Sequence, residues 1–165
     1  MVTADEGSLP ILRGSMRILL AVDGSPYSAA AADAVSKRPW PQGTIVRVLS
    51  AVENIVPPAA ELWYDAAGNL EETRRQITSQ AKQLTDEIAE RVRANGFTVE
   101  TAVRHGDPRS VIIDEATEWD ADLIVVGSHG YTGIKRWLLG SVAYSVASHA
   151  PCSVEIVRQK RTEER

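Results

Sequence analysis

The sequence is poor in cysteine, with Cys152 as the single thiol among 165 residues. One thiol cannot form a disulfide within the chain, so nothing indicates an oxidising compartment. Long apolar runs are missing too, and none approaches the roughly 20 residues that a membrane helix needs. The first 15 residues lack the basic and then apolar order of a secretion signal. These absences predict a cytoplasmic protein that makes no contact with membranes.

Positive charge is also scarce, since 18 lysines and arginines stand against 22 acidic residues and give a net charge of −4. The basic residues are scattered along the chain, apart from a mixed charged tail. Such a balance argues against nucleic acid as the main partner. The length suits one domain. We expect a flexible extension over residues 1–15, a single domain over residues 16–158 and a charged tail over residues 159–165.

What the chain does have is an alternation of short apolar runs with helical patterns. The predicted strands cover residues 16–22, 44–52, 97–103, 123–126 and 153–157, and the predicted helices cover residues 26–37, 69–94, 108–119 and 141–149. Residues 53–68 are predicted to form a long loop that could contain a helical turn. This order predicts an α/β fold with an open five-stranded parallel sheet and helices on both faces, in the manner of a Rossmann fold.

Three helix starts carry capping signals. Ser25 precedes a proline at position 26, and Asp107 precedes one at position 108, which is the usual order of N-cap and first helical residue. Asn69 and Glu72 have the spacing of a capping box at the start of the longest helix. We therefore expect helices to begin next to Ser25, Asp107 and Asn69.

The strongest functional signal is a spaced glycine pattern late in the chain. Gly127 and Gly130 follow the fourth predicted strand, and nine residues later Gly140 and Ser141 open a predicted helix. Glycine lets the backbone approach an anion closely, and a helix start offers unpaired N–H groups. We expect these residues, with Val142, to bind phosphate groups. The alternative is that the glycines only turn the chain and Ser141 only caps its helix.

Other residues are predicted to complete a nucleotide site because ligands of such sheets bind at the carboxyl ends of the strands. Asp23 follows the first strand, where a carboxylate can accept both ribose hydroxyls or help to hold Mg²⁺ beside the phosphates. It could instead be a plain turn residue. His129 could donate to a phosphate or pack on its neighbours. Small apolar residues could form adenine walls or ordinary core: Ala21, Val22, Ala51 and Val126.

The pattern departs from the two familiar phosphate loops. No G-x-x-x-x-G-K followed by serine or threonine occurs, and no G-x-G-x-x-G follows the first strand. The sequence instead resembles the universal stress protein family, whose ATP-binding signature has the spacing of Gly127, Gly130, Gly140 and Ser141. Asp23 and the Gly-Asp-Pro run at 106–108 also fit this resemblance, which covers roughly residues 16–158.

The resemblance implies a five-stranded α/β fold, an ATP pocket and a homodimer built partly on the last strand. Two positions depart from the family pattern. Tyr131 stands where the family often has a basic residue, which puts one phosphate contact in doubt. Glu155 lies in the last strand, where it would point to solvent or mark a differently arranged dimer edge.

Three functions follow as hypotheses. The leading one is a cytoplasmic homodimer that binds ATP or a related adenine nucleotide and signals stress or energy state to an unidentified protein partner. No arrangement of residues typical of a catalyst is evident, so we expect no enzyme beyond a weak ATPase activity. The second is a hydrolase or phosphotransferase that uses Asp23, His129 and a divalent ion. The third is an interaction module whose pocket is empty or takes a cyclic nucleotide.

Overall fold

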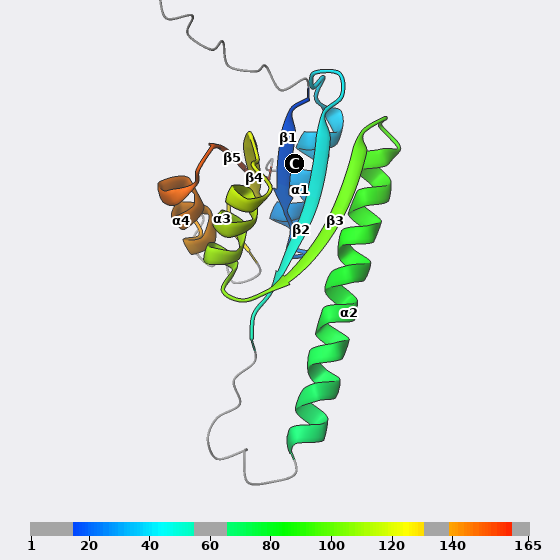
Figure 1. Cartoon of the computed structure of the whole chain (residues 1–165), viewed down its shortest axis with the longest axis vertical. Coiled ribbons are helices and arrows are strands. Elements are labelled where there is room, and N and C mark those ends of the chain that lie inside the picture. Colours follow the sequence, from blue (N-terminus) through cyan, green and yellow to red (C-terminus); the bar gives the residue numbers. More distant parts are fainter. Residues whose placement is uncertain (1–14, 55–65, 131–138, 160–165) are drawn as a thin grey trace, which may run out of the picture.

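The computed structural model describes residues 15–54, 66–130 and 139–159, with the backbone alone for residues 66–69 (Figure 1). The strands are β1 Arg17–Ala21, β2 Ile45–Val52, β3 Thr98–His105, β4 Leu123–Gly127 and β5 Ser153–Val157. The helices are α1 Pro26–Lys37, α2 Ala66–Arg93, α3 Pro108–Glu118 and α4 Ser141–His149. The strands form one five-stranded parallel sheet, so the predicted α/β fold is confirmed.

The strand order is β3-β2-β1-β4-β5. The chain builds outward from β1 through β2 to β3, then returns to the other side of β1 to place β4 and β5. The order therefore reverses between β1 and β4, which pair in register from Ile18 with Leu123 to Leu20 with Val125. At such a reversal the connections leave in opposite directions and open a crevice above the carboxyl ends of the strands.

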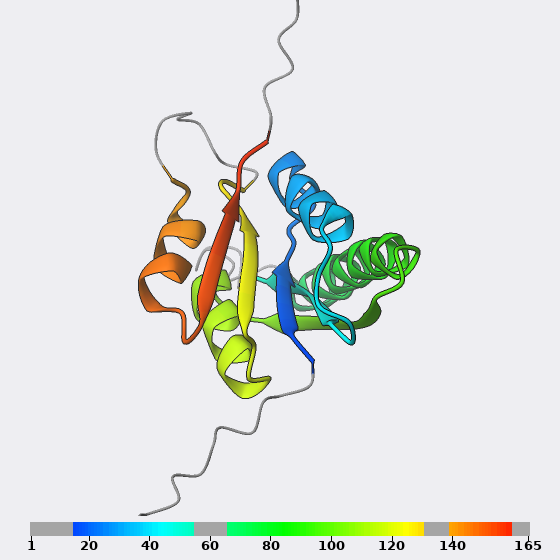
Figure 2. The ribbon, with the colours of Figure 1, turned by 90° about the horizontal axis from the view of Figure 1, so that it is seen from above.

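Helices cover both faces of the sheet, with α1 and α2 on one and α3 and α4 on the other (Figure 2). Successive side chains of a strand alternate between these faces. In β1, Ile18 and Leu20 pack with the α1 and α2 side of the core, whereas Leu19 packs with the α3 and α4 side. Strand β4 is apolar up to its final glycine, as expected for a strand buried on both faces.

Two of the predicted helix starts are confirmed. The Ser25 hydroxyl accepts a hydrogen bond from the Ser28 N–H at 3.2 Å, and the Asp107 carboxylate accepts one from the Arg109 N–H at 2.9 Å. A proline follows each cap, where its missing N–H costs no helical hydrogen bond. These local signals set where α1 and α3 begin.

The prediction for the start of α2 was wrong. Helix α2 begins at Ala66, so residues 66–68 are helical and Asn69 lies inside the helix rather than at its N-cap. Two alanines at 66 and 67, the best helix formers, extend the helix beyond the capping signal. The remainder of the predicted loop, residues 55–65, lies outside the described residues.

Two strands run longer than predicted. Strand β3 continues to His105 because β2 pairs with it as far as Val52. Strand β4 includes Gly127, which pairs with Val157 of β5. The glycine pattern thus begins inside the sheet and not in a loop.

The carboxylate of Glu155 does not simply point to solvent. Strand β5 is an edge strand, but the Glu155 side chain forms an ion pair with Arg38, which follows α1, and is only 23% exposed. The carboxylate therefore belongs to the contact between β5 and α1. Tyr131 lies outside the described residues. Within the part of the chain that the structure describes, no helix is long and apolar enough to cross a membrane.

Helix α3 is held against the sheet by a buried carboxylate. Glu115 is 3% exposed and accepts hydrogen bonds from Arg47 Nη1 at 2.8 Å and Arg104 Nε at 2.9 Å. The Arg47 guanidinium also lies 4.4 Å from the ring centroid of Trp119. Pairing of this kind offsets the cost of burying a charge and fixes the orientation of the helix.

Candidate functional site

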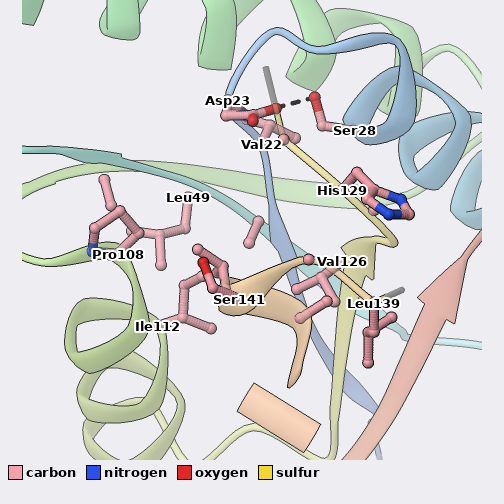
Figure 3. Close-up of a pocket in the computed structure, with 17 residues that line it drawn as sticks. Val22, Asp23, Ser28, Leu49, Pro108, Ile112, Val126, His129, Leu139 and Ser141 are labelled. Carbon is pink, nitrogen blue, oxygen red and sulfur yellow. Dashed lines mark hydrogen bonds between the residues drawn. The ribbon is translucent and has the colours of Figure 1, made fainter. Parts of the chain in front are cut away.

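A cavity of about 460 Å³ opens at the carboxyl edge of the sheet, at the reversal between β1 and β4 (Figure 3). Its size falls in the range of small-molecule sites. Every residue predicted for the nucleotide site lines it: Ala21, Val22, Asp23, Ala51, Val126, Gly127, His129, Gly130, Gly140, Ser141 and Val142. Residues that are far apart in the sequence thus meet at one place in the fold.

The start of α4 gives the cavity its N–H donors. Gly140 is the N-cap, and no side chain forms a capping hydrogen bond there. The N–H groups of Ser141, Val142 and Ala143 come before the first helical hydrogen bond, so they have no partner within the helix. All three residues line the cavity. The positive end of the helix dipole also points there, which makes this end of the cavity suited to an anion.

Gly140 forms the start of this helix, as predicted, but uses its own N–H within the protein. Its N–H donates to the Ser128 carbonyl at 2.9 Å, so that group serves the protein and not a ligand. A Cβ at Gly140 would lie 3.0 Å from the Ser128 oxygen and 3.1 Å from the His129 Cα. The missing side chain therefore lets the loop after β4 sit against the start of α4.

The other two glycines also permit close contacts. A Cβ on Gly127 would lie 2.7 Å from the carbonyl carbon of Tyr27, so bare backbone is needed where β4 meets α1. A Cβ on Gly130 would lie 2.8 Å from Asp23 Oδ2. Gly127 thus serves packing, and Gly130 lets the loop approach the carboxylate of Asp23.

The Asp23 carboxylate is oriented by the turn between β1 and α1. Its Oδ1 accepts a hydrogen bond from the Ser25 N–H at 2.9 Å, while its own N–H points to the Ser28 hydroxyl at 3.4 Å. The second oxygen, Oδ2, is beside Gly130 in the cavity wall. Asp23 is an exposed residue, and among the described residues no group of three or more acidic, histidine or cysteine side chains could hold a metal ion.

His129 both packs and lines the cavity. Its ring centroid lies 5.1 Å from that of Tyr27, with the planes tilted by 47°. Its Nδ1 lies 3.1 Å from the hydroxyl of Ser128, which is buried. His129 therefore packs on its neighbours, and this packing holds the ring at the cavity wall.

The sequence analysis missed several apolar lining residues. Leu49, Pro108, Ile112 and Leu139 add a hydrophobic wall, and Ser28 and Ala143 complete the lining. Leu49 looks like any other buried residue of a strand. Pro108 was within reach of sequence reasoning, because it follows β3 and so lies at the same edge of the sheet.

Comparison with known proteins gives a consistent result. Residues 14–158 match the model of the universal stress protein family. Universal stress protein YxiE of Bacillus subtilis is 31% identical over 145 residues, which cover 86% of this chain and 98% of the relative.

Solved structures share the fold. The structure of UspA from Lactobacillus plantarum is 25% identical, has a TM-score of 0.72 and covers 87% of this chain and 97% of its own. A universal stress protein solved in complex with cAMP is also 25% identical, with a TM-score of 0.54 and coverage of 86% and 95%.

Proposed function

The chain belongs to the universal stress protein family, and from that premise we propose that it binds ATP or a related adenine nucleotide and regulates a response to stress or energy state. The observation that carries this proposal is the start of α4, where three N–H groups without helical partners line the same cavity as an apolar wall and a lone carboxylate. A phosphate chain, a base and a ribose need these three kinds of surface.

Each part of the nucleotide has a proposed position. The phosphates lie against the N–H groups of Ser141 and Val142, with the Ser141 hydroxyl as a further donor. The ribose hydroxyls donate to Asp23, whose Oδ2 is not the oxygen held by Ser25. The adenine lies among Ala51, Val126 and their apolar neighbours. His129, packed on Tyr27, is placed at the cavity wall as a donor to phosphate.

A magnesium ion fits this site only as part of the nucleotide complex. Asp23 offers one carboxylate, and Mg²⁺ in nucleotide sites is held by one or two carboxylates, water and the phosphates. When bound, the ion would neutralise phosphate charge. In this alternative to the ribose contact, Asp23 would be the single acidic ligand of the ion, and phosphate oxygens and water would supply the rest.

We infer that binding, not turnover, is the function. Among the described residues of the cavity, Asp23 is the lone acid, and the His129 ring packs on Tyr27. The competing hypothesis of a slow hydrolase makes a distinct prediction: Asp23→Ala would abolish ATP turnover while binding persists.

The proposal also includes the oligomeric state and the cellular location of the protein. The exposed edge of β5 is proposed as the homodimer contact, because an edge strand presents unpaired backbone groups that a second copy can pair. The domain is proposed to cover residues 16–158, to act in the cytoplasm and to present its nucleotide state to a protein partner.

The first experiment is to denature the purified protein and identify any released nucleotide by chromatography and mass spectrometry. Stoichiometric ATP is the expected result. An empty extract calls for calorimetric titration with ATP, AMP and cAMP, and no saturable binding of any of them would refute the proposal. Gly140→Val is expected to abolish binding, because its side chain meets the Ser128 oxygen and the His129 Cα.

A cyclic nucleotide is the second candidate ligand, favoured by the cAMP complex of a protein 25% identical to this chain. Competition separates the two candidates. If ATP displaces bound cAMP at equal concentration, the linear nucleotide is the ligand, and the reverse result assigns the site to the cyclic one.

A further inference from the structure

A second hollow, distinct from the nucleotide cavity, lies between α2 and the end of β3. It measures about 490 Å³ and is lined by Glu71, Arg74, Arg75, Thr78, Lys82 and His105, together with Ser79. Four of these side chains are basic and one is acidic, in a chain whose net charge is −4. We propose that this groove binds a small anion that carries several phosphoryl groups.

The helix spacing places the cations along one line. Residues 71, 74, 75, 78 and 82 recur at intervals of three and four, so they share one face of α2. Arg74 and Lys82 are eight residues apart, which is about 12 Å along a helix. The cations of the groove are therefore spread over a length greater than that of one phosphate, which suits an elongated anion better.

Strand β3 supplies the other wall. His105 is its last residue, and its Nε2 lies 3.5 Å from the Thr78 hydroxyl. That hydroxyl donates to the Arg74 carbonyl at 2.8 Å. The contact seats the imidazole against α2 and so joins the two elements that form the groove.

The acidic member of the groove is partly neutralised. The Glu71 carboxylate lies 3.4 Å from Arg75 Nε, and both side chains are more than half exposed. Lys82, by contrast, forms no ion pair within the described parts of the chain. The lining thus has three lysine or arginine side chains and one carboxylate, and the N–H groups of these cations match the acceptor oxygens of phosphoryl groups.

The groove is separate from the nucleotide cavity although both lie at the carboxyl edge of the sheet. Ala51 lines the nucleotide cavity, and the next residue, Val52, borders a small hollow with Arg74 and His105. Neighbouring residues of a strand point to opposite faces. In Figure 1, α2 continues past the end of β3. The hollow lined by the basic residues of α2 also includes His105 at that end of β3. An anion here would not compete with a nucleotide for contacts.

The test uses tripolyphosphate as the probe and the full chain with its nucleotide site saturated. Amide chemical shifts of residues 74–82 and of His105 are expected to move with a saturable dependence on the probe. Lys82→Glu is expected to weaken binding about tenfold, since it reverses a charge in contact with the anion. Lys37→Glu is the matched control on α1, where the same charge change is far from the groove, and is expected to leave binding within about twofold.

Three results would overturn the proposal. The first is that tripolyphosphate changes amide chemical shifts only at the start of α4. The second is that Lys82→Glu and Lys37→Glu weaken tripolyphosphate binding equally. The third is that a hexaglutamate peptide binds as tightly as tripolyphosphate. The last result would assign the groove to acidic peptide. Adenine nucleotide affinity, measured on the same Lys82→Glu protein, is expected to be unchanged, so a failure of this proposal is distinguishable from a failure of the proposed function.

Discussion

Replacing Asp23 by asparagine removes a charge from the nucleotide cavity while it conserves the shape of the side chain. Oδ1 of Asp23 accepts the Ser25 N–H at 2.9 Å, and the amide oxygen of asparagine can keep that bond. The NH₂ group then takes the place of Oδ2 beside Gly130. An acceptor becomes a donor at the position proposed for the ribose hydroxyls, so those hydroxyls lose their partner.

The expected loss follows from the setting of the carboxylate. A hydrogen bond to a charged group contributes about 1.5–3 kcal/mol. Asp23 is an exposed residue, and solvent weakens its interactions, so we expect a smaller contribution of about 1–2 kcal/mol. Since 1.4 kcal/mol corresponds to a factor of ten, the dissociation constant for ATP is expected to rise roughly 5- to 30-fold.

Isothermal titration of both proteins with ATP measures this change, and Asp33→Asn is the matched control. Asp33 lies on α1 and pairs with Lys37 and Arg91, away from the cavity lining. Titrations with and without Mg²⁺ separate the two roles proposed for Asp23, because a ribose contact is lost under both conditions and a metal contact only with the ion. An unchanged affinity in Asp23→Asn, or an equal loss in Asp33→Asn, would refute the assignment.

Further predictions test packing, ionisation and burial. Gly127→Ala places a Cβ 2.7 Å from the Tyr27 backbone, so urea unfolding should show a loss of about 1–3 kcal/mol, whereas Gly130→Ala meets only the flexible end of Asp23 and should cost less; equal losses would contradict the packing argument. The side-chain hydrogen bond from Arg109 lowers the pKa of the Asp107 carboxyl from 3.8 to about 2. The folded pKa is depressed, so the stabilisation is present above pH 4 and is lost as the pH falls toward 2. Carbon-13 titration should give that midpoint, and Arg109→Gln should return it toward 3.8; a midpoint that Arg109→Gln does not move would rule out this cause. Burial raises the pKa of the Cys152 thiol, so iodoacetamide at pH 8 should alkylate the native protein more slowly than the urea-unfolded chain, and equal rates would show that the thiol is open to solvent.

Local signals predicted two of the three helix starts correctly. The proline after Ser25 and the one after Asp107 mark helix starts because a cap and its first turn are made within four residues. The same reasoning failed at Asn69, where a valid capping pattern lies inside a longer helix. Alanine at 66 and 67 favours continuation of α2 beyond that pattern, because alanine has the highest helix propensity.

The roles of the glycines show a different limit. Their spacing predicted where the loop and the helix start would lie, and all of them line the cavity. The spacing gave no sign that Gly127 packs on Tyr27 or that the Gly140 N–H bonds to Ser128. Those contacts join residues about 100 and 12 positions apart, and they exist only when β4, α1 and α4 are assembled.

By itself, the sequence determined the alternation of strands and helices, the caps of α1 and α3, and the glycine and carboxylate groups that line one cavity. Hydrophobic periodicity and capping depend on residues close together in the chain, so both can be recognised from the sequence. Tertiary structure alone decided the strand order, the apolar wall from α3, the burial of Glu115 between two arginines, and the cationic groove beside His105. Each of these depends on which distant segments meet, and the packing of the whole sheet sets that choice.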